Sequence, residues 1–460
     1  MITESHDTEY YKVADSVRKI NSGFQRKATV ITFGCQQNEA DSEHIRGILF
    51  DMGYENTEDY SAADVIILNT CAIRGHAEEK AFSFLGNFKA LKKNNPSLIV
   101  GVCGCMAAEA GALKSLKENF HYVTFTLEPN MLHRLPSLIL KSLTEGKRSF
   151  IIGEDTGDII EGLPTLRMGG HRAWVSVMYG CNNFCSYCIV PYVRGRERSR
   201  RSADIISECR SLIASGVREI TLLGQNVNSY YSDLCFADLL EKIALIEGDF
   251  IIRFMTSHPK DVSDRLIEVI GRYSPKIAPY FHLPLQSGSN RVLKAMNRSY
   301  TKEKFLEIVD KLRTSVPDIA ISTDVIIGFP TEHSEDFFET MEIIRKVRFD
   351  MAYSFIYSPR EGTRAALIES VSSDEERADR MKEFLDVQGE ISYEKNLPYV
   401  GRTVRVLVDS VSKRGGDSTY SARTDSNKLV HFTSAKSYIG EFINLKITRV
   451  GAFDLFGEIT

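Results

Sequence analysis

Three cysteines lie close together in the segment Gly180-Cys181-Asn182-Asn183-Phe184-Cys185-Ser186-Tyr187-Cys188. With the spacing Cys-x3-Cys-x2-Cys, three thiolates on one loop can hold three corners of a cubane iron–sulfur cluster and leave the fourth iron open to a cofactor. Two other interpretations stay open, namely zinc ligands and small core residues. Structural zinc normally takes four ligands, often from paired Cys-x2-Cys knuckles, and no second pair or nearby histidine completes such a set. We therefore favour the cluster.

Three further cysteines follow predicted strands in the N-terminal part of the chain. Cys35, Cys71 and Cys105 each come after a strand, and these strands are predicted at residues 28–33, 64–69 and 98–102. Because the carboxyl ends of parallel strands share one edge of a sheet, where ligands bind, we expect a second thiolate triad there. The alternative is three unrelated buried cysteines. Cys103, two residues before Cys105, is expected to fill the core.

Polar residues also gather near strand ends in the middle of the chain. Strands are predicted there at residues 173–179, 218–224, 250–256, 279–284, 319–327 and 350–357, with amphipathic helices between them. Gln225, Ser257, Gln286 and Asp324 lie at the ends of four of these strands, which is where parallel barrels bind ligands. From this position alone they are candidates for holding a cofactor. Turn formation or helix capping remains the alternative for each one taken singly.

A run of arginines follows the cysteine triplet. Residues 194–201 hold five arginines and one glutamate. Such a run is often a solvated face, and that interpretation stays open. Its position next to the predicted ligand site favours guanidinium contacts with nucleic-acid phosphates, for which we select Arg194, Arg196 and Arg198.

The pattern of elements that must position these residues predicts three domains in an α/β protein. Alternating strands and helices over residues 27–150 predict an open parallel α/β domain. A glycine-rich connection leads to residues 168–395, where six strand–helix units predict a partial (βα)6 barrel. From residue 397 to 460 the hydrophobic period changes to two, which predicts a small β-barrel.

Composition and charge limit the kinds of partner. With 43% hydrophobic and 26% charged residues and a net charge of −4, the 460-residue chain is not built wholly for binding polyanions. Residues 397–460 nevertheless hold more basic than acidic residues, which favours an RNA-binding appendage over a structural lid. No apolar run is long enough for a membrane span and no secretory signal is recognisable, so a cytoplasmic protein without a membrane partner is expected. Nine cysteines in such a protein favour metal binding or catalysis over disulfides.

Several motifs together resemble the methylthiotransferase family of radical S-adenosylmethionine enzymes, along nearly the whole chain from about residue 27. They are Gly34-Cys35, Asn69-Thr70-Cys71, Gly104-Cys105-Met106, the triplet Cys181, Cys185 and Cys188 with the aromatic Tyr187, and His282-Leu283-Pro284-Leu285-Gln286-Ser287-Gly288-Ser289. The C-terminal residues look like a TRAM module. The segments Val190-Pro191-Tyr192-Val193-Arg194-Gly195-Arg196 and Thr256-Ser257-His258-Pro259 are similar to the tRNA-modifying branch of the family. Gln37 stands where that branch usually has methionine.

The resemblance implies a transferase that adds a methylthio group to C-2 of N(6)-isopentenyladenosine beside the tRNA anticodon. It implies a radical-generating [4Fe-4S] cluster on Cys181, Cys185 and Cys188, and an auxiliary cluster of the same type on the other three cysteines. It further implies S-adenosylmethionine as cofactor and methyl donor, with Tyr187, Gln225, Ser257, Gln286 and Asp324 as its candidate contacts. A flavodoxin or ferredoxin is the expected electron donor, an isopentenylated anticodon stem-loop the expected partner, and a monomer the expected state.

Two rival functions stay open. Sister branches of the family act on threonylcarbamoyladenosine in tRNA or on a ribosomal protein. A member of another class would be a non-enzymatic iron–sulfur protein that binds RNA. The sequence does not decide the composition of the auxiliary cluster, the source of replacement sulfur or the order of the chemical steps.

Overall fold

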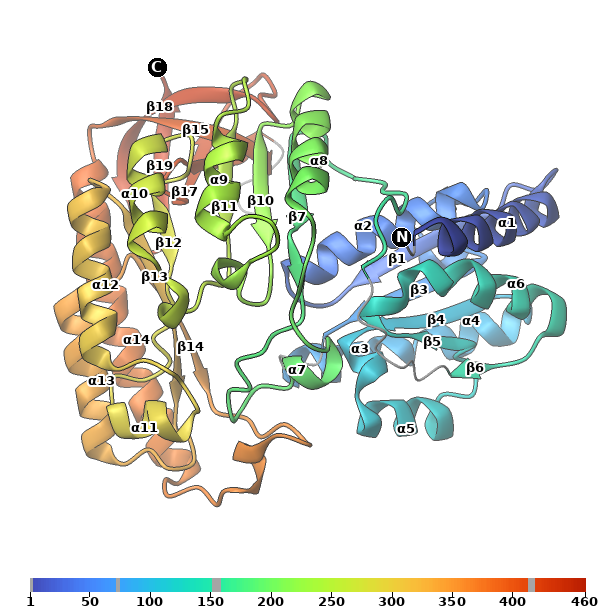
Figure 1. Ribbon diagram of the computed structural model, residues 1–460, viewed down its shortest axis with the longest axis horizontal. Coiled ribbons are helices and arrows are strands. Elements are labelled where there is room, and N and C mark those ends of the chain that lie inside the picture. Colours follow the sequence, from blue (N-terminus) through green and yellow to red (C-terminus); the bar gives the residue numbers. More distant parts are fainter. Residues whose placement is uncertain (1–2, 72–74, 151–158, 413–417) are drawn as a thin grey trace. The chain divides into compact units, whose positions relative to one another are not determined.

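The computed structural model spans residues 1–460 and describes residues 3–71, 75–150, 159–412 and 418–460 (Figure 1). The chain forms two compact units. The first comprises Met1–Met168, Tyr179–Asn182 and Cys188–Arg198, and the second comprises Gly169–Met178, Asn183–Tyr187 and Ser199–Thr460. Among the described residues, no helix combines the length and apolar character that a membrane crossing requires.

The first unit is built on a six-stranded parallel sheet with the order β2-β1-β3-β4-β5-β6. Its strands are β1 (Lys27–Thr32), β2 (Glu55–Asn56), β3 (Val65–Thr70), β4 (Ile99–Gly104), β5 (Phe125–Leu127) and β6 (Ser149–Phe150). The helices of this unit are α1 (Thr3–Asn21), α2 (Gln36–Asp51), α3 (Gly75–Leu85), α4 (Phe88–Asn94), α5 (Ala110–Asn119), α6 (Leu135–Glu145) and the short α7 (Val190–Val193). The expected open parallel α/β fold is therefore confirmed.

Both faces of this sheet are covered, because successive strand residues point to opposite sides. In β3, Val65 and Ile67 pack into the cluster that contains α1, α2 and α6 residues, whereas Ile66 and Leu68 pack with residues of α3, α4 and α5. Part of the predicted glycine-rich connection also belongs to this unit, since Leu166 N–H donates to the Glu43 carbonyl at 2.9 Å. Residues 151–158 of that connection lie outside the described part of the chain.

The second unit contains the six predicted strands as two three-stranded parallel sheets, with the orders β11-β10-β7 and β12-β13-β14. The strands are β7 (Arg172–Ser176), β10 (Glu219–Leu223), β11 (Ile251–Phe254), β12 (Tyr280–His282), β13 (Ala320–Ile327) and β14 (Met351–Ile356). A parallel bridge between Ile252 and Ile277 links the two sheets, so strands adjacent in the chain are neighbours in space. This is the partial barrel that the sequence predicts. Two short strands, β8 (Met178–Tyr179) and β9 (Arg198–Ser199), lie where the chain passes between the units.

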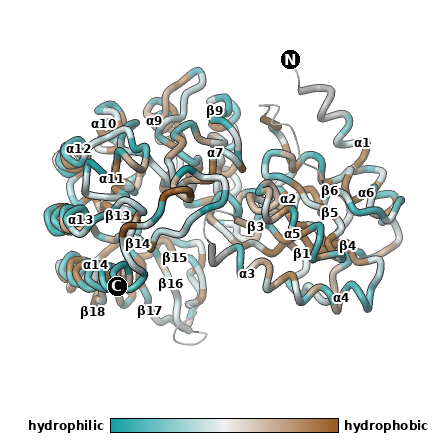
Figure 2. Tube along the Cα trace, turned by 90° about the horizontal axis from the view of Figure 1, so that it is seen from below, coloured by the Kyte–Doolittle hydropathy of each residue, from teal (hydrophilic) through white to brown (hydrophobic). Residues whose placement is uncertain are grey.

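Helices cover the outside of the barrel strands (Figure 1). The helices of the second unit are α8 (Ser202–Ala214), α9 (Phe236–Ala244), α10 (Asp264–Tyr273), α11 (Asn290–Ala295), α12 (Lys302–Ser315), α13 (Ser334–Val347) and α14 (Asp374–Asn396). Along α12, α13 and α14 the trace alternates between hydrophilic and hydrophobic colours (Figure 2), as expected for helices with one buried face.

The C-terminal residues form a closed barrel with the strand order β15-β16-β17-β19-β18. Its strands are β15 (Thr403–Val411), β16 (Thr419–Thr424), β17 (Leu429–Thr433), β18 (Phe442–Val450) and β19 (Asp454–Ile459). Alternate residues such as Val406, Val408 and Leu445 fill its interior. The change of hydrophobic period to two near residue 400 thus predicted the right architecture.

A buried ion pair joins this small barrel to the strands of the larger one. Arg253 on β11 donates to Glu219 on β10 at 2.7 Å and to the carbonyl oxygens of Thr424 and Asp425 at 2.8 and 2.9 Å. Arg172 pairs with the same Glu219. The two guanidiniums hold the pKa of Glu219 below its ordinary value, although burial alone acts in the opposite direction.

Candidate functional site

The three N-terminal cysteines follow three adjacent strands of the parallel sheet. Cys35 lies at the start of α2 just beyond β1, Cys71 follows β3 directly, and Cys105 begins a 3-10 turn after β4. In the register of the sheet, Thr32 pairs with Asn69 and Thr70 with Gly104, so the three strand ends lie side by side. The topology therefore brings together the residues that the sequence grouped by position alone.

The thiols of this triad influence one another. The pKa of Cys35 is lowered to about 6, chiefly by its hydrogen bond with Cys71. Burial acts in the opposite direction, and the guanidinium of Arg194 lowers the pKa further. Burial raises the pKa of Cys105, while the guanidinium of Arg194 acts in the opposite direction. A thiolate is the form that binds metal, so the polar partners around Cys35 favour the state that a cluster requires.

Two glycines allow the strand ends to approach closely. A Cβ atom on Gly34 would lie 2.9 Å from the Cβ of Cys71, and one on Gly104 would lie 2.2 Å from the Thr70 carbonyl oxygen. Gly104 also has φ of +92°, a conformation that other residues rarely adopt. These contacts explain why glycine precedes Cys35 and Cys105.

Two asparagines fasten the loops that carry the cysteines. Asn38 donates to the Thr70 carbonyl at 2.8 Å and to Asn69 Oδ1 at 3.1 Å, and it accepts the Cys35 thiol proton at 3.3 Å. Asn69 in turn donates to the Asn38 carbonyl at 2.8 Å. The Gly-Cys and Asn-Thr-Cys motifs are thus parts of one hydrogen-bonded arrangement.

Arg194 belongs to the same unit and lies beside this triad. Its side chain is only 2% exposed; Nε donates to Cys105 Sγ at 3.2 Å and Nη2 to the Asp41 carboxylate at 2.9 Å. These contacts contradict the expectation that Arg194 binds RNA phosphates, because its guanidinium is buried and already engaged. Arg196 is exposed and Arg198 is partly buried, with its guanidinium donating to the Arg194 carbonyl at 3.2 Å.

The two outer cysteines of the triplet belong to the first unit. Cys181 is buried, and its backbone N–H donates to the Gly195 carbonyl at 3.2 Å. The preceding Gly180 has φ of +73°, and a Cβ there would lie 2.0 Å from the Arg196 carbonyl oxygen. Cys188 is partly exposed and directly precedes Ile189, which packs with Val193 and Cys105.

The middle of the triplet loop belongs to the second unit and is held by the end of α11. Asn297 donates to the carbonyl oxygens of Asn183 and Phe184 at 3.2 and 2.9 Å, and Ser186 N–H donates to the Met296 carbonyl at 2.9 Å. Arg298 points its guanidinium at Cys185, with 3.5 Å between Nη1 and Sγ. No motif of the sequence includes Asn297 or Arg298, so their contacts with the triplet loop were not predicted.

A single metal ion and an iron–sulfur cluster place different demands on their thiolate ligands. Among the residues that the structure describes, no three cysteine, histidine or acidic side chains converge closely enough to hold one metal ion. In a cubane cluster each thiolate binds a different iron, so the sulfurs need not converge on one point. Buried thiols with arginine N–H donors nearby, at Cys105 and Cys185, fit this kind of ligand set.

The polar residues predicted at strand ends are all in the second unit. Gln225 Oε1 and Ser257 Oγ are buried and have no hydrogen-bond partner among the described residues. Such atoms are uncommon in folded proteins and are frequently satisfied by a ligand or water. Asp324 Oδ2 lies 3.4 Å from Nε2 of His282, a residue that was quoted in a motif but not selected. Gln286 is buried and is fixed through its backbone, whose N–H donates to the Asp324 carbonyl at 2.8 Å.

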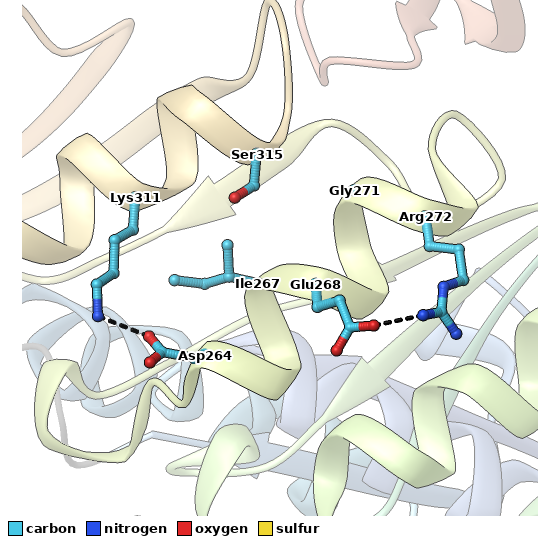
Figure 3. A pocket seen from close by; sticks show the side chains of 7 residues that line it. All are labelled: Asp264, Ile267, Glu268, Gly271, Arg272, Lys311 and Ser315. Atoms are coloured by element: carbon cyan, nitrogen blue, oxygen red, sulfur yellow. Dashed lines mark hydrogen bonds and ion pairs between the residues drawn. The ribbon is translucent and has the colours of Figure 1, made fainter.

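Tyr187 and a surface hollow also belong to the second unit. Tyr187 packs against a small hydrophobic cluster that includes Met296 and Phe329. A hollow of about 510 Å³ lies between α10 and α12 (Figure 3), where Lys311 pairs with Asp264 at 2.7 Å and Arg272 pairs with Glu268. It contains none of the predicted site residues, and its charges are matched within its own walls.

Comparison with known proteins assigns three parts of the chain. Residues 27–127 match Uncharacterized protein family UPF0004, residues 175–344 match the Radical SAM superfamily, and residues 398–460 match the TRAM domain. The Radical SAM match implies a [4Fe-4S] cluster and S-adenosylmethionine.

Curated relatives cover the full length. The tRNA-2-methylthio-N(6)-dimethylallyladenosine synthase of Thermoanaerobacter pseudethanolicus is 46% identical, over 100% of this chain and 98% of its own. The protein of the same name from Geobacillus kaustophilus is 44% identical, over 98% of this chain and 85% of its own.

Among solved structures, the radical S-adenosylmethionine methyltransferase TsrM from Kitasatospora setae, with cobalamin and a [4Fe-4S] cluster bound, has a TM-score of 0.55. The match covers 75% of this chain and 77% of that one at 12% identity, so it supports the fold alone.

Proposed function

The chain belongs to the family of tRNA-2-methylthio-N(6)-dimethylallyladenosine synthases (MiaB), and on that premise we propose that it adds a methylthio group to C-2 of N(6)-isopentenyladenosine beside the tRNA anticodon. The observation that carries the proposal is the thiol triad at three adjacent strand ends, in a chain that also bears a Cys-x3-Cys-x2-Cys loop. One cysteine set would serve radical generation and the other sulfur delivery. A chain that binds a single cluster would need only one of these two cysteine sets.

The assignment of ligands follows from the two settings. Cys181, Cys185 and Cys188 would hold the radical-generating [4Fe-4S] cluster, and Cys35, Cys71 and Cys105 an auxiliary cluster of the same type. An aromatic C–H bond resists acid–base chemistry by side chains, so the clusters and S-adenosylmethionine supply the radical, the sulfur and the methyl group when bound. The side chains hold these groups in place and exclude water from them.

Unsatisfied polar atoms support the proposed contacts with S-adenosylmethionine. The cofactor has amino, carboxylate and ribose groups that can satisfy Gln225 Oε1 and Ser257 Oγ, both buried without a partner among the described residues. Asp324 is partly exposed, so its carboxylate can accept hydrogen bonds from the ribose or amino group. Gln286 and Tyr187 complete the proposed set.

The RNA is proposed to bind through the C-terminal barrel and Arg196. Arg196 is exposed, and the barrel carries exposed basic side chains such as Arg449 and Lys446. Contacts with phosphates make binding depend on salt, because counterions are released. The target base must leave its stack to reach the cofactors, which suits a single-stranded anticodon loop. We further propose a monomer that acts in the cytoplasm and takes electrons from a flavodoxin or ferredoxin.

The function is tested in a bacterial strain that lacks its own enzyme of this family. Expression of the wild-type chain should convert N(6)-isopentenyladenosine in tRNA to its 2-methylthio derivative, measured by mass spectrometry of digested tRNA. Unchanged isopentenyladenosine, together with a new methylthio group on threonylcarbamoyladenosine or on a ribosomal protein, would assign the chain to a sister branch. Purified protein that forms no 5′-deoxyadenosine from S-adenosylmethionine under reducing conditions would favour a non-enzymatic role.

A further inference from the structure

The contacts of Arg194 are not those of an arginine that merely pairs with a carboxylate. A guanidinium that serves only as a counterion usually binds a carboxylate through two parallel N–H donors. Here the two donors are divided, with Nη2 on Asp41 Oδ2 at 2.9 Å and Nε on Cys105 Sγ at 3.2 Å. Asn38 Oδ1, at 3.5 Å from Nη2, lies on the same side. The geometry therefore directs one N–H group at a cysteine sulfur.

The backbone around Arg194 fixes this direction. Its carbonyl accepts hydrogen bonds from Asn130 Nδ2 at 3.3 Å and from Arg198 Nη2 at 3.2 Å. The residues just before it, Ile189 and Val193, pack directly with Cys105. Because both ends of the side chain are held, Nε has little freedom to turn away from the sulfur.

The positive charge of Arg194 would also affect the reduction potential of a cluster bound at Cys105. Asp41 is buried with Arg194, so the pair is formally neutral, but the cationic member is the one that touches the thiol. A positive charge close to a cluster stabilises the reduced state, which is the more negative one, and thereby raises the reduction potential. Hydrogen bonds to cluster sulfurs act in the same direction.

We propose that Arg194 is a positioning residue for the auxiliary cluster: anchored by Asp41, it donates a hydrogen bond to the sulfur of Cys105 and makes a cluster on Cys35, Cys71 and Cys105 easier to reduce. This inference rests on the proposed function, which places a cluster on that triad. It adds a residue from the segment after the radical-SAM triplet to the surroundings of the other cysteine set. Arg194 lies six positions after Cys188 in the chain.

The test uses the full-length chain in which Cys181, Cys185 and Cys188 are all replaced by alanine, so that a single cluster is observed. In this parent, Arg194→Met should lower the ratio of reduced to oxidised cluster at least tenfold at a fixed ambient potential. For a one-electron couple that corresponds to about 59 mV. The readout is a potentiometric titration followed by electron paramagnetic resonance, together with iron and sulfide content.

Two further variants separate the effect on the cluster from an effect on folding. Asp41→Asn combined with Arg194→Met removes both buried charges, so the fold is spared an unpaired carboxylate while the hydrogen bond to sulfur stays absent. Its potential should remain below that of the parent. The control is Arg148→Met, since Arg148 lies in the same unit and, among the residues that the structure describes, donates to backbone carbonyls such as those of Val123 and Leu116. It should lower thermal stability and leave the potential unchanged.

The outcomes distinguish this inference from the function on which it rests. A parent that binds iron and sulfide, with the same potential and spectrum after Arg194→Met and in the double variant, would overturn the role of Arg194 alone. A parent that binds neither iron nor sulfide would overturn the auxiliary cluster and, with it, this inference. A lowered potential in both arginine variants, with no change in the Arg148→Met control, supports it.

Discussion

Replacement of Arg253 by methionine should loosen the C-terminal barrel from the rest of the second unit. The guanidinium donates three hydrogen bonds, one to Glu219 and two to backbone carbonyls of the small barrel, and it is only 4% exposed. Removing one member of a buried ion pair costs about 3–5 kcal/mol. Because Arg172 still pairs with Glu219, we expect a value near the lower limit, about 3 kcal/mol.

Hydrogen exchange measured by mass spectrometry gives the most direct reading of this loss. A change of about 3 kcal/mol in the opening free energy corresponds to roughly 100-fold faster exchange, at about 1.4 kcal/mol per factor of ten. The increase should be confined to peptides from β16 and β17, since Arg253 contacts the turn between these strands. Strands of the first unit should exchange as in the wild type.

Arg423→Met is a matched control for Arg253→Met. Arg423→Met removes an arginine of the same small barrel that pairs with Asp409 at 3.4 Å and is about one-third exposed. It should change exchange much less, since pairs of this kind contribute roughly 0–1 kcal/mol. Equal exchange of β16 and β17 in wild type and Arg253→Met would show that the buried ion pair does not hold the barrel in place.

Substitutions at other sites also have defined outcomes. Cys35→Ala should reduce methylthio transfer by more than about 100-fold yet preserve reductive cleavage of S-adenosylmethionine, because loss of a residue that merely supports a metal ligand already lowers metal affinity or activity about 10–100-fold. Cys185→Ala should abolish cleavage. The two activities are measured as modified nucleoside and as 5′-deoxyadenosine, and loss of both in Cys35→Ala would contradict separate roles. Gly104→Ala should lower the free energy of unfolding by about 3 kcal/mol or more, because its Cβ would meet a backbone oxygen. Gly146→Ala, where a Cβ would enter open space, should lower it by about 1 kcal/mol. Both values are measured by denaturant unfolding. The lowered pKa of Glu219 gives stability that is complete above its ordinary pKa of 4.5 and is lost as pH falls through the folded value, so the stability difference from Glu219→Gln should vanish in strong acid.

The clustering of Cys35, Cys71 and Cys105 could be predicted from the sequence because the strand ends of a parallel sheet lie along one edge, whereas their role as cluster ligands stays a prediction. Once β1, β3 and β4 are recognised as alternating with helices, the residues that follow them must meet at one edge. Cys35, Cys71 and Cys105 needed no other information. The glycines and asparagines in the same motifs became intelligible only in the structure, because their roles depend on distances between neighbouring strands.

Arg194 shows where sequence reasoning failed. A run with five arginines in eight residues has the pattern of a solvated or nucleic-acid-binding face. The partner that buries Arg194 is Asp41 on α2, more than 150 residues away, and no local pattern connects the two. The contacts with S-adenosylmethionine were likewise selected by position, and their atomic roles remain predictions.

The small barrel is closed by β19, which is synthesised after its other four strands. Because β19 pairs with both β17 and β18, the ring cannot be completed until Asp454–Ile459 have been translated. A product that stops before Asp454 would keep two strands with unsatisfied backbone groups, each a template for another chain. Prematurely terminated copies should therefore self-associate in the cell, and disposing of them would fall to chaperones and proteases.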